Sequence, residues 1–155
     1  MAADELRTSG LKIARFSNRG GRRPDLSSLV ALLHVSESSA PDATVIEAIR
    51  AESRHNNLRD DVTGLLLFDG RAFCQYMEGG GSALADLLKR LQADPRHRDM
   101  RVLHYDEVAR RSFSEWRLGF AYVADPQAIE RVSMRDRDSL SEALRDLVRE
   151  SGASE

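Results

Sequence analysis

The order of strand-like and helix-like segments is the feature of this sequence that most constrains its fold. Residues 28–36 form a nearly continuous apolar run, which is typical of a buried strand. Residues 40–57 follow with apolar side chains at helical spacing. Residues 61–79 then predict two strands joined by a tight turn at Asp69 and Gly70, because an Asp-Gly pair between apolar runs is a strong hairpin signal.

A second helix and two more strands complete the pattern. Residues 81–95 carry leucines at helical spacing, and Pro95 lies where that helix should end. Residues 99–109 and residues 115–123 each predict a strand. The resulting order, βαββαββ, predicts an α+β, ferredoxin-like sandwich in which two helices cover one face of a mixed sheet.

The two ends of the chain differ from this core. Residues 1–27 include a basic stretch that is poor in apolar side chains, so we expect a flexible extension. We assign residues 28–124 to one domain and residues 125–155 to a C-terminal helical extension. In that extension apolar residues recur every four positions, as at Leu140 and Leu144. This spacing predicts one or two helices that pack on the free sheet face or on a partner chain.

Composition excludes several classes of protein. The chain has 155 residues, is 41% hydrophobic and 31% charged, and carries a net charge of -2. This charge favours neither nucleic acid nor an acidic membrane as a partner. Its one cysteine, Cys74, allows no internal disulfide, and no apolar run approaches the roughly 20 residues that span a bilayer. We therefore expect a cytoplasmic protein.

Polar side chains interrupt the predicted strands at two buried positions. Gln75 shares a strand face with Phe73 and Met77, because strand side chains alternate between faces. A buried amide without partners costs about 1–3 kcal/mol, so Gln75 must find hydrogen bonds in the protein or in a ligand. His34 interrupts the first strand in the same way. The strands that lead into the two helices are central neighbours in this fold, so His34 and Gln75 can meet between the helices.

Asn56 and Asn57 are expected where the first helix ends, and helix capping is the simplest role for either. Together with His34 and Gln75, they would surround an apolar slot that suits a planar heterocycle with several acceptors and one N–H. No set of His, Cys, Asp and Glu has metal-ligand spacing, so we expect no metal. The glycines at 79–81 lack the Lys-Ser/Thr sequel of a nucleotide-binding P-loop.

Three segments, residues 56–79, 90–103 and 110–120, resemble the BLUF domain, a flavin-based blue-light sensor. The resemblance extends from about Leu29 to Phe120. It implies the fold expected above, FAD as the cofactor with its ring between the two helices, and a sensor that signals through protein contacts rather than an enzyme.

The resemblance also implies cofactor-binding roles for individual residues. Gln75 matches the glutamine that bonds the flavin ring and reorients after excitation, and Asn57 matches an asparagine on the same ring edge. From the residues alone, Trp116 is equally a plain core side chain, and the pair Arg96 and His97 equally a solvated loop. The full set of implied positions is His34, Ser36, Asn56, Asn57, Gln75, Arg96, His97, Trp116 and Leu118.

His34 departs from the family pattern, which has a tyrosine at this position. That phenol bonds the glutamine and donates an electron and then a proton to excited flavin. Imidazole can occupy the space and form hydrogen bonds, but it is much harder to oxidise. The departure predicts an altered or lost photocycle.

Three functions are compatible with the sequence. The first is a flavin-binding BLUF protein that acts on a separate protein partner of unknown identity. The second is a BLUF-derived interaction module without flavin, and the third, ranked last, is a small flavin enzyme. A homodimer or higher oligomer is implied by analogy with short BLUF proteins, but a tail folded on its own sheet fits the sequence equally.

Overall fold

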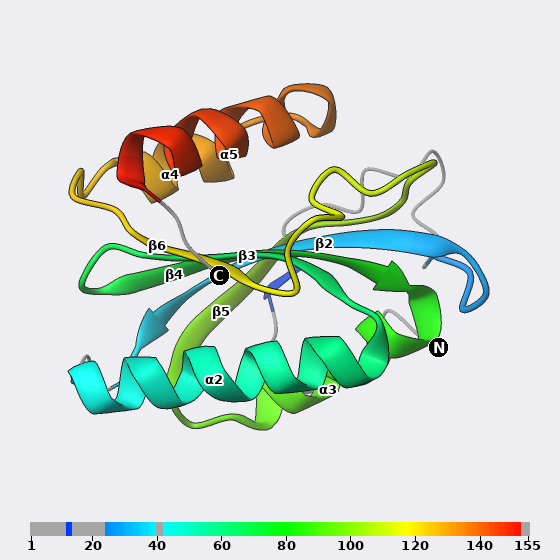
Figure 1. The fold of residues 1–155 in the computed structure, drawn as a ribbon, viewed down its shortest axis with the longest axis horizontal. Coiled ribbons are helices and arrows are strands. Elements are labelled where there is room, and N and C mark those ends of the chain that lie inside the picture. Colours follow the sequence, from blue (N-terminus) through cyan, green and yellow to red (C-terminus); the bar gives the residue numbers. More distant parts are fainter. Residues whose placement is uncertain (1–11, 14–23, 40–41, 153–155) are drawn as a thin grey trace.

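The computed structural model describes residues 12–13, 24–39 and 42–152, and a six-stranded mixed sheet forms its centre. The strand order is β1-β5-β2-β4-β3-β6. The strands are β1 (Lys12–Ile13), β2 (Leu29–Ser38), β3 (Thr63–Phe68), β4 (Ala72–Gly80), β5 (His97–Glu107) and β6 (Gly119–Tyr122). The helices are α2 (Ala43–Asp60), α3 (Gly81–Ala93), α4 (Ala128–Ser133) and α5 (Arg137–Ser151). Figure 1 shows α2 and α3 on one face of the sheet and α4 and α5 on the other.

The topology confirms the predicted ferredoxin-like sandwich. β2 and β4, which lead into α2 and α3, pair antiparallel at the centre of the sheet. β3 pairs antiparallel with β4, and β6 is added in parallel at the outer edge of β3. β5 pairs antiparallel with β2, and its outer side pairs in parallel with the short β1.

Each face of the sheet has its own apolar core. Phe73 and Met77 of β4 pack toward α2 and α3, with Val30 and Leu32 of β2. Cys74 and Tyr76, which alternate with that face along β4, pack toward α4 and α5. The predicted alternation along β4 is therefore confirmed. Since both faces are covered, the central strands have no solvated side, which explains their continuous apolar runs.

The C-terminal helices fold back on the sheet of the same chain. The apolar side of α5 is buried against the core that contains Cys74 and Tyr76, and it consists of Leu140, Leu144, Leu147 and Val148. This segment was expected to pack either on the free sheet face or on a partner chain. In the structure it packs on the free sheet face.

Two local predictions were wrong. The last strand begins at Gly119 rather than near residue 115, because the preceding backbone turns and donates or accepts hydrogen bonds outside the sheet ladder. The helix α2 does not end at Asn57 but continues to Asp60. Its cap is Asp61 in the left-handed conformation (φ 53°), which a short polar side chain tolerates, and the Asp61 N–H donates to the carbonyl of Asn57.

The predicted N-terminal extension lies mostly outside the described residues. Its described part includes β1 and residues 24–27, which turn into the adjoining Ser28. The carbonyls of Leu26 and Ser28 accept hydrogen bonds from the amides of Ser82 and Gly81 at the start of α3. The boundaries of the extensions stay predictions. Within the described ranges, no helix has both the length and the apolar character needed to cross a membrane.

Candidate functional site

His34 and Gln75 form a buried polar pair at the centre of the sheet. They lie directly opposite each other on β2 and β4, and His34 Nε2 is 2.7 Å from Gln75 Oε1. Burial, aided by the nearby His97, lowers the pKa of His34 to about 4, while the bond to Gln75 acts weakly in the opposite direction. The imidazole is therefore neutral near pH 7. Because the amide oxygen only accepts, Nε2 carries the proton and Nδ1 is an acceptor.

His97 connects this pair to the space between α2 and α3. Its ring centroid lies 6.1 Å from that of His34 and 4.9 Å from that of Phe73. Its Nδ1 is 2.8 Å from the hydroxyl of the buried Ser36. Burial lowers the pKa of His97, and the carboxylate of Asp94 partly offsets this effect. His97 thus contacts the sheet with one edge and also lines a cavity.

That cavity has a volume of about 470 Å³ and lies between α2 and α3. Such a volume falls within the ordinary range for small-molecule sites. Its apolar wall is formed by Ile49, Leu87 and Leu91, and its polar lining includes Asn56 and His97. An apolar slot with a few convergent polar groups is the form expected of a site for a planar ring.

Charged side chains stand at the rim of the cavity. Arg96 forms ion pairs with Asp94 (2.6 Å) and Glu52 (2.9 Å), and these carboxylates raise the pKa of its guanidinium. Arg90 pairs with Asp60 at 3.1 Å. The two arginines give the rim cationic groups, each of which already has an acidic partner within the protein.

Asn57 lies on the last turns of α2 and points toward the sheet rather than to solvent. Only 1% of its surface is exposed. Its Nδ2 donates to the carbonyl of Arg117 at 2.5 Å and lies 4.0 Å from the sulfur of Met77, which shares a strand face with Gln75. The loop that contains Arg117 thus holds the Asn57 side-chain amide in place.

The structure brings together eight of the nine implied residues and separates one. Leu118 is buried in the core on the α2 and α3 side of the sheet, whereas Trp116 packs against the core on the α4 and α5 side. The residues on the cavity side are His34, Ser36, Asn56, Asn57, Gln75, Arg96, His97 and Leu118.

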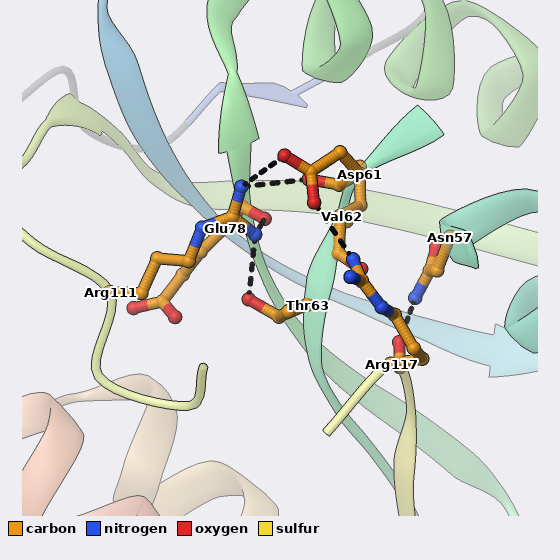
Figure 2. A network of polar contacts seen from close by, with 7 residues as sticks. All are labelled: Asn57, Asp61, Val62, Thr63, Glu78, Arg111 and Arg117. Atoms are coloured by element: carbon orange, nitrogen blue, oxygen red, sulfur yellow. Dashed lines mark hydrogen bonds and ion pairs between the residues drawn. The ribbon is translucent and has the colours of Figure 1, made fainter. Parts of the chain in front are cut away.

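Sequence reasoning missed a polar network beside Asn57. Figure 2 shows Arg111 and Arg117, from the segment between β5 and β6, reaching Asp61 at the end of α2. The carboxylate of Glu78 is fully buried and accepts from two backbone amides of that segment. The alternation along β4 that indicated a buried Gln75 also predicts that Glu78 lies on a buried face. The sequence therefore contained a pattern from which a buried Glu78 could have been predicted.

The residues on the cavity side fit the ring of a flavin. The buried Nδ1 of His34 has no hydrogen-bond partner among the described residues, so it is an acceptor left over by the fold. Buried polar atoms of this kind are rare in proteins and indicate a ligand or water. Neutral amide and imidazole groups, together with the apolar wall, match the acceptors, the single N–H and the flat faces of such a ring.

A sequence profile of one family covers the core of the chain. The BLUF profile, described as sensors of blue-light using FAD, matches residues 29–119. The chain belongs to the BLUF family. This identification confirms the resemblance carried by residues 56–79, 90–103 and 110–120, and the family description attaches a flavin to this fold.

Known BLUF proteins match this chain in sequence and in structure. Photoactivated adenylate cyclase subunit beta of Euglena gracilis is 28% identical over 118 residues, which cover 75% of this chain and 14% of that protein. The blue light- and temperature-regulated antirepressor BluF of Escherichia coli is 30% identical over 90 residues, 58% of this chain and 22% of that protein. The dark-state structure of the BLUF protein BlrB has a TM-score of 0.66 and 28% identity, covering 80% of this chain and 97% of that chain.

The curated relatives are much longer proteins. This chain spans 14% of the length of the cyclase subunit and 22% of the length of the antirepressor. In a BlrP1 structure from Klebsiella pneumoniae, the match (TM-score 0.62, 29% identity) likewise covers 78% of this chain but 33% of that one. The common part is the BLUF domain, and the effector activities in these names belong to the relatives.

Proposed function

We propose that this chain binds FAD between α2 and α3 and acts as a BLUF sensor whose light response is altered or lost. The observation that carries the proposal is the buried His34–Gln75 pair, 2.7 Å apart, next to a cavity of about 470 Å³. A glutamine is present where the family resemblance implies one, but its partner is an imidazole. The proposed output is contact with a separate protein, and the chain itself performs no catalysis.

Several side chains would hold the cofactor. Asn57, Asn56 and Gln75 offer neutral amides to the polar edge of the ring, and the wall around Leu91 would cover its faces. Arg96 at the rim offers positive charge to the phosphates of FAD. Bound flavin would supply the absorption of blue light.

His34 is the reason to expect an altered response. Because burial keeps the imidazole neutral, His34 can donate a hydrogen bond to Gln75 as a phenol can. Imidazole does not readily give up an electron. In addition, Tyr76 and Trp116 pack against the core on the opposite side of the sheet, so neither faces the cavity.

A second function is favoured because several polar groups of the site already have hydrogen-bond or ion-pair partners within the protein. The Asn57 amide already donates to Arg117, and the rim arginines already have acidic partners. A module that keeps the fold without flavin, and serves only for protein contacts, would show the same pairing.

An absorption spectrum of the purified protein, recorded before and after blue light, tests the proposal. Flavin absorption without a stable red shift is the expected result. A colourless protein that takes up no added FAD would support the flavin-free module, and a normal reversible red shift would show that tyrosine is dispensable here.

The role of Asn57 is tested separately. Asn57→Ala removes an amide from the site and should weaken FAD binding by about 1–3 kcal/mol, which titration calorimetry with FAD measures. Gln127→Ala serves as the control amide deletion, because Gln127 is exposed at the start of α4, on the opposite side of the sheet. Equal affinity of the two variants would remove Asn57 from the site.

A further inference from the structure

The segment between β5 and β6, residues 108–118, passes from one face of the sheet to the other. Phe113 belongs to the core beneath α4 and α5, and Leu118 to the core beneath α2 and α3. We call residues 108–118 the β5–β6 loop. Because it lies outside the strand ladder, its path depends on side-chain contacts at both of its ends.

Arg111 and Glu78 fix the first half of the β5–β6 loop. Arg111 donates to the Thr63 hydroxyl (2.9 Å) and to the Asp61 carbonyl (2.8 Å), as Figure 2 shows. It also donates to the Glu78 carbonyl (3.1 Å). The Glu78 carboxylate accepts from the amide of Ser112 at 2.6 Å and from the next amide at 3.0 Å. Charge-assisted bonds of this kind, two of them to a fully buried carboxylate, hold a backbone firmly.

The second half of the β5–β6 loop is fixed beside Asn57. The amide of Gly64 donates to the carbonyl of Trp116 at 3.1 Å. Arg117 pairs with Asp61 at 2.9 Å, while its own carbonyl receives the Asn57 amide. The direction of the Asn57 side chain is therefore set by the position of this loop.

The same loop is attached to α5 on the opposite face. The guanidinium of Arg145 donates to the carbonyl of Ser112 and lies 4.8 Å above the ring of Phe113. Phe113 in turn packs edge-on against Tyr76, with ring centroids 5.7 Å apart. A displacement of α5 would thus remove contacts from the half of the loop that Glu78 also binds.

We propose that Glu78, Arg111 and Asp61 are positioning residues for Asn57, and that Arg145 couples the docking of α5 to flavin binding through the β5–β6 loop. None of the four needs to touch the cofactor. The proposal rests on the proposed function in one respect, that Asn57 contacts flavin. Since a coupling between two sites is reciprocal, flavin should stabilise the docked α5 to the same extent that docked α5 tightens flavin binding.

Arg145→Gln tests the coupling, with Arg149→Gln as the matched control. Both arginines are exposed on α5, but Arg145 contacts Ser112 and Phe113 of the loop, whereas Arg149 pairs with Asp146, one turn away on the same helix. In the FAD-free protein, hydrogen exchange should become faster at Ser112 and Phe113 in Arg145→Gln and stay unchanged in Arg149→Gln. Titration with FAD should then show binding weakened about fivefold in Arg145→Gln only.

Arg117→Gln tests the positioning step without altering the carbonyl that Asn57 contacts. Arg131→Gln, which removes an exposed pair with Asp125, is its control. We expect weaker FAD binding in Arg117→Gln and faster exchange at residues 116–118, with neither change in the control. A conservative Arg117→Lys substitution should restore part of the affinity by restoring the charge.

The outcomes separate this proposal from the proposed function. An unmodified protein that binds no FAD overturns the proposed function and the coupling to flavin with it. FAD binding that is equally tight in Arg145→Gln and Arg149→Gln overturns the coupling alone. Unchanged hydrogen exchange of the β5–β6 loop in both Arg145→Gln and Arg117→Gln overturns the claim that these contacts fix the loop.

Discussion

Lowering the pH from about 7.5 to about 5 should destabilise the folded protein through His34. The pKa of this imidazole is about 4 in the folded protein, against an ordinary value of 6.5. As the pH falls, the unfolded chain takes up the proton first, so the stability due to neutral His34 is complete above about pH 6.5 and is lost toward pH 4. Integrated from about pH 7.5 to pH 5, the loss in the free energy of unfolding is about 2 kcal/mol.

Urea denaturation of the unmodified protein and of His34→Gln, at both pH values, measures this loss in the free energy of unfolding. Glutamine does not titrate and can still donate to Gln75, so the variant should lose about 2 kcal/mol less on acidification. His97 titrates in both proteins and cancels in the comparison. His55→Gln, at an exposed position of α2, should behave like the unmodified protein. Equal losses in all three proteins would refute a buried, neutral His34.

Other predictions test the photochemistry, the backbone and the cysteine. In the FAD-loaded protein, His34→Tyr should gain a reversible red shift under blue light; a flavin-loaded variant that stays silent would mean that the defect is not confined to this position. Gly64→Ala should cost about 3 kcal/mol or more in thermal denaturation, since a Cβ there would overlap the Tyr76 carbonyl, whereas Gly70→Ala, at φ 96° in open space, should cost about 1–2 kcal/mol. Similar losses would contradict the close approach at Gly64. Burial raises the pKa of Cys74 to about 12, so a thiol reagent should label it in urea and leave it intact in native buffer.

The sequence was most informative where one periodicity dominated. The run from residues 28 to 36 and the hairpin at Gly70 have one reasonable interpretation each, and the structure contains both. The proximity of His34 and Gln75 was predicted from two local facts. Each side chain was assigned to a face of the sheet, and the two strands were assigned to its centre. Both facts were correct, so the predicted pair is present at the predicted place.

Sequence reasoning failed where long-range polar contacts replace periodicity. The strand expected around Trp116 has the right residue types, but its backbone groups bond to Gly64, to the nearby Phe113 and to the Asn57 side chain instead of forming a ladder. Asn57 was expected near a helix end, where its type suggests a cap, yet it lies inside α2 and its side chain binds a loop sixty residues away. Pairings at such separations leave no local pattern in a single sequence.

The covered faces of the sheet have a consequence for how the chain finds its native pairing during folding. When one face of a strand is exposed to solvent, the hydrophobic pattern fixes its register with the neighbouring strand, because a register shift of one residue would expose the apolar side chains. β2 is apolar toward both layers, so this penalty is weak along Val30–Val35. A slipped alignment would instead carry His34 to the other layer, away from Gln75, and leave two buried polar groups unpaired at about 1–3 kcal/mol each. The same two residues that form the candidate site therefore help to select the correct alignment of β2 on β4.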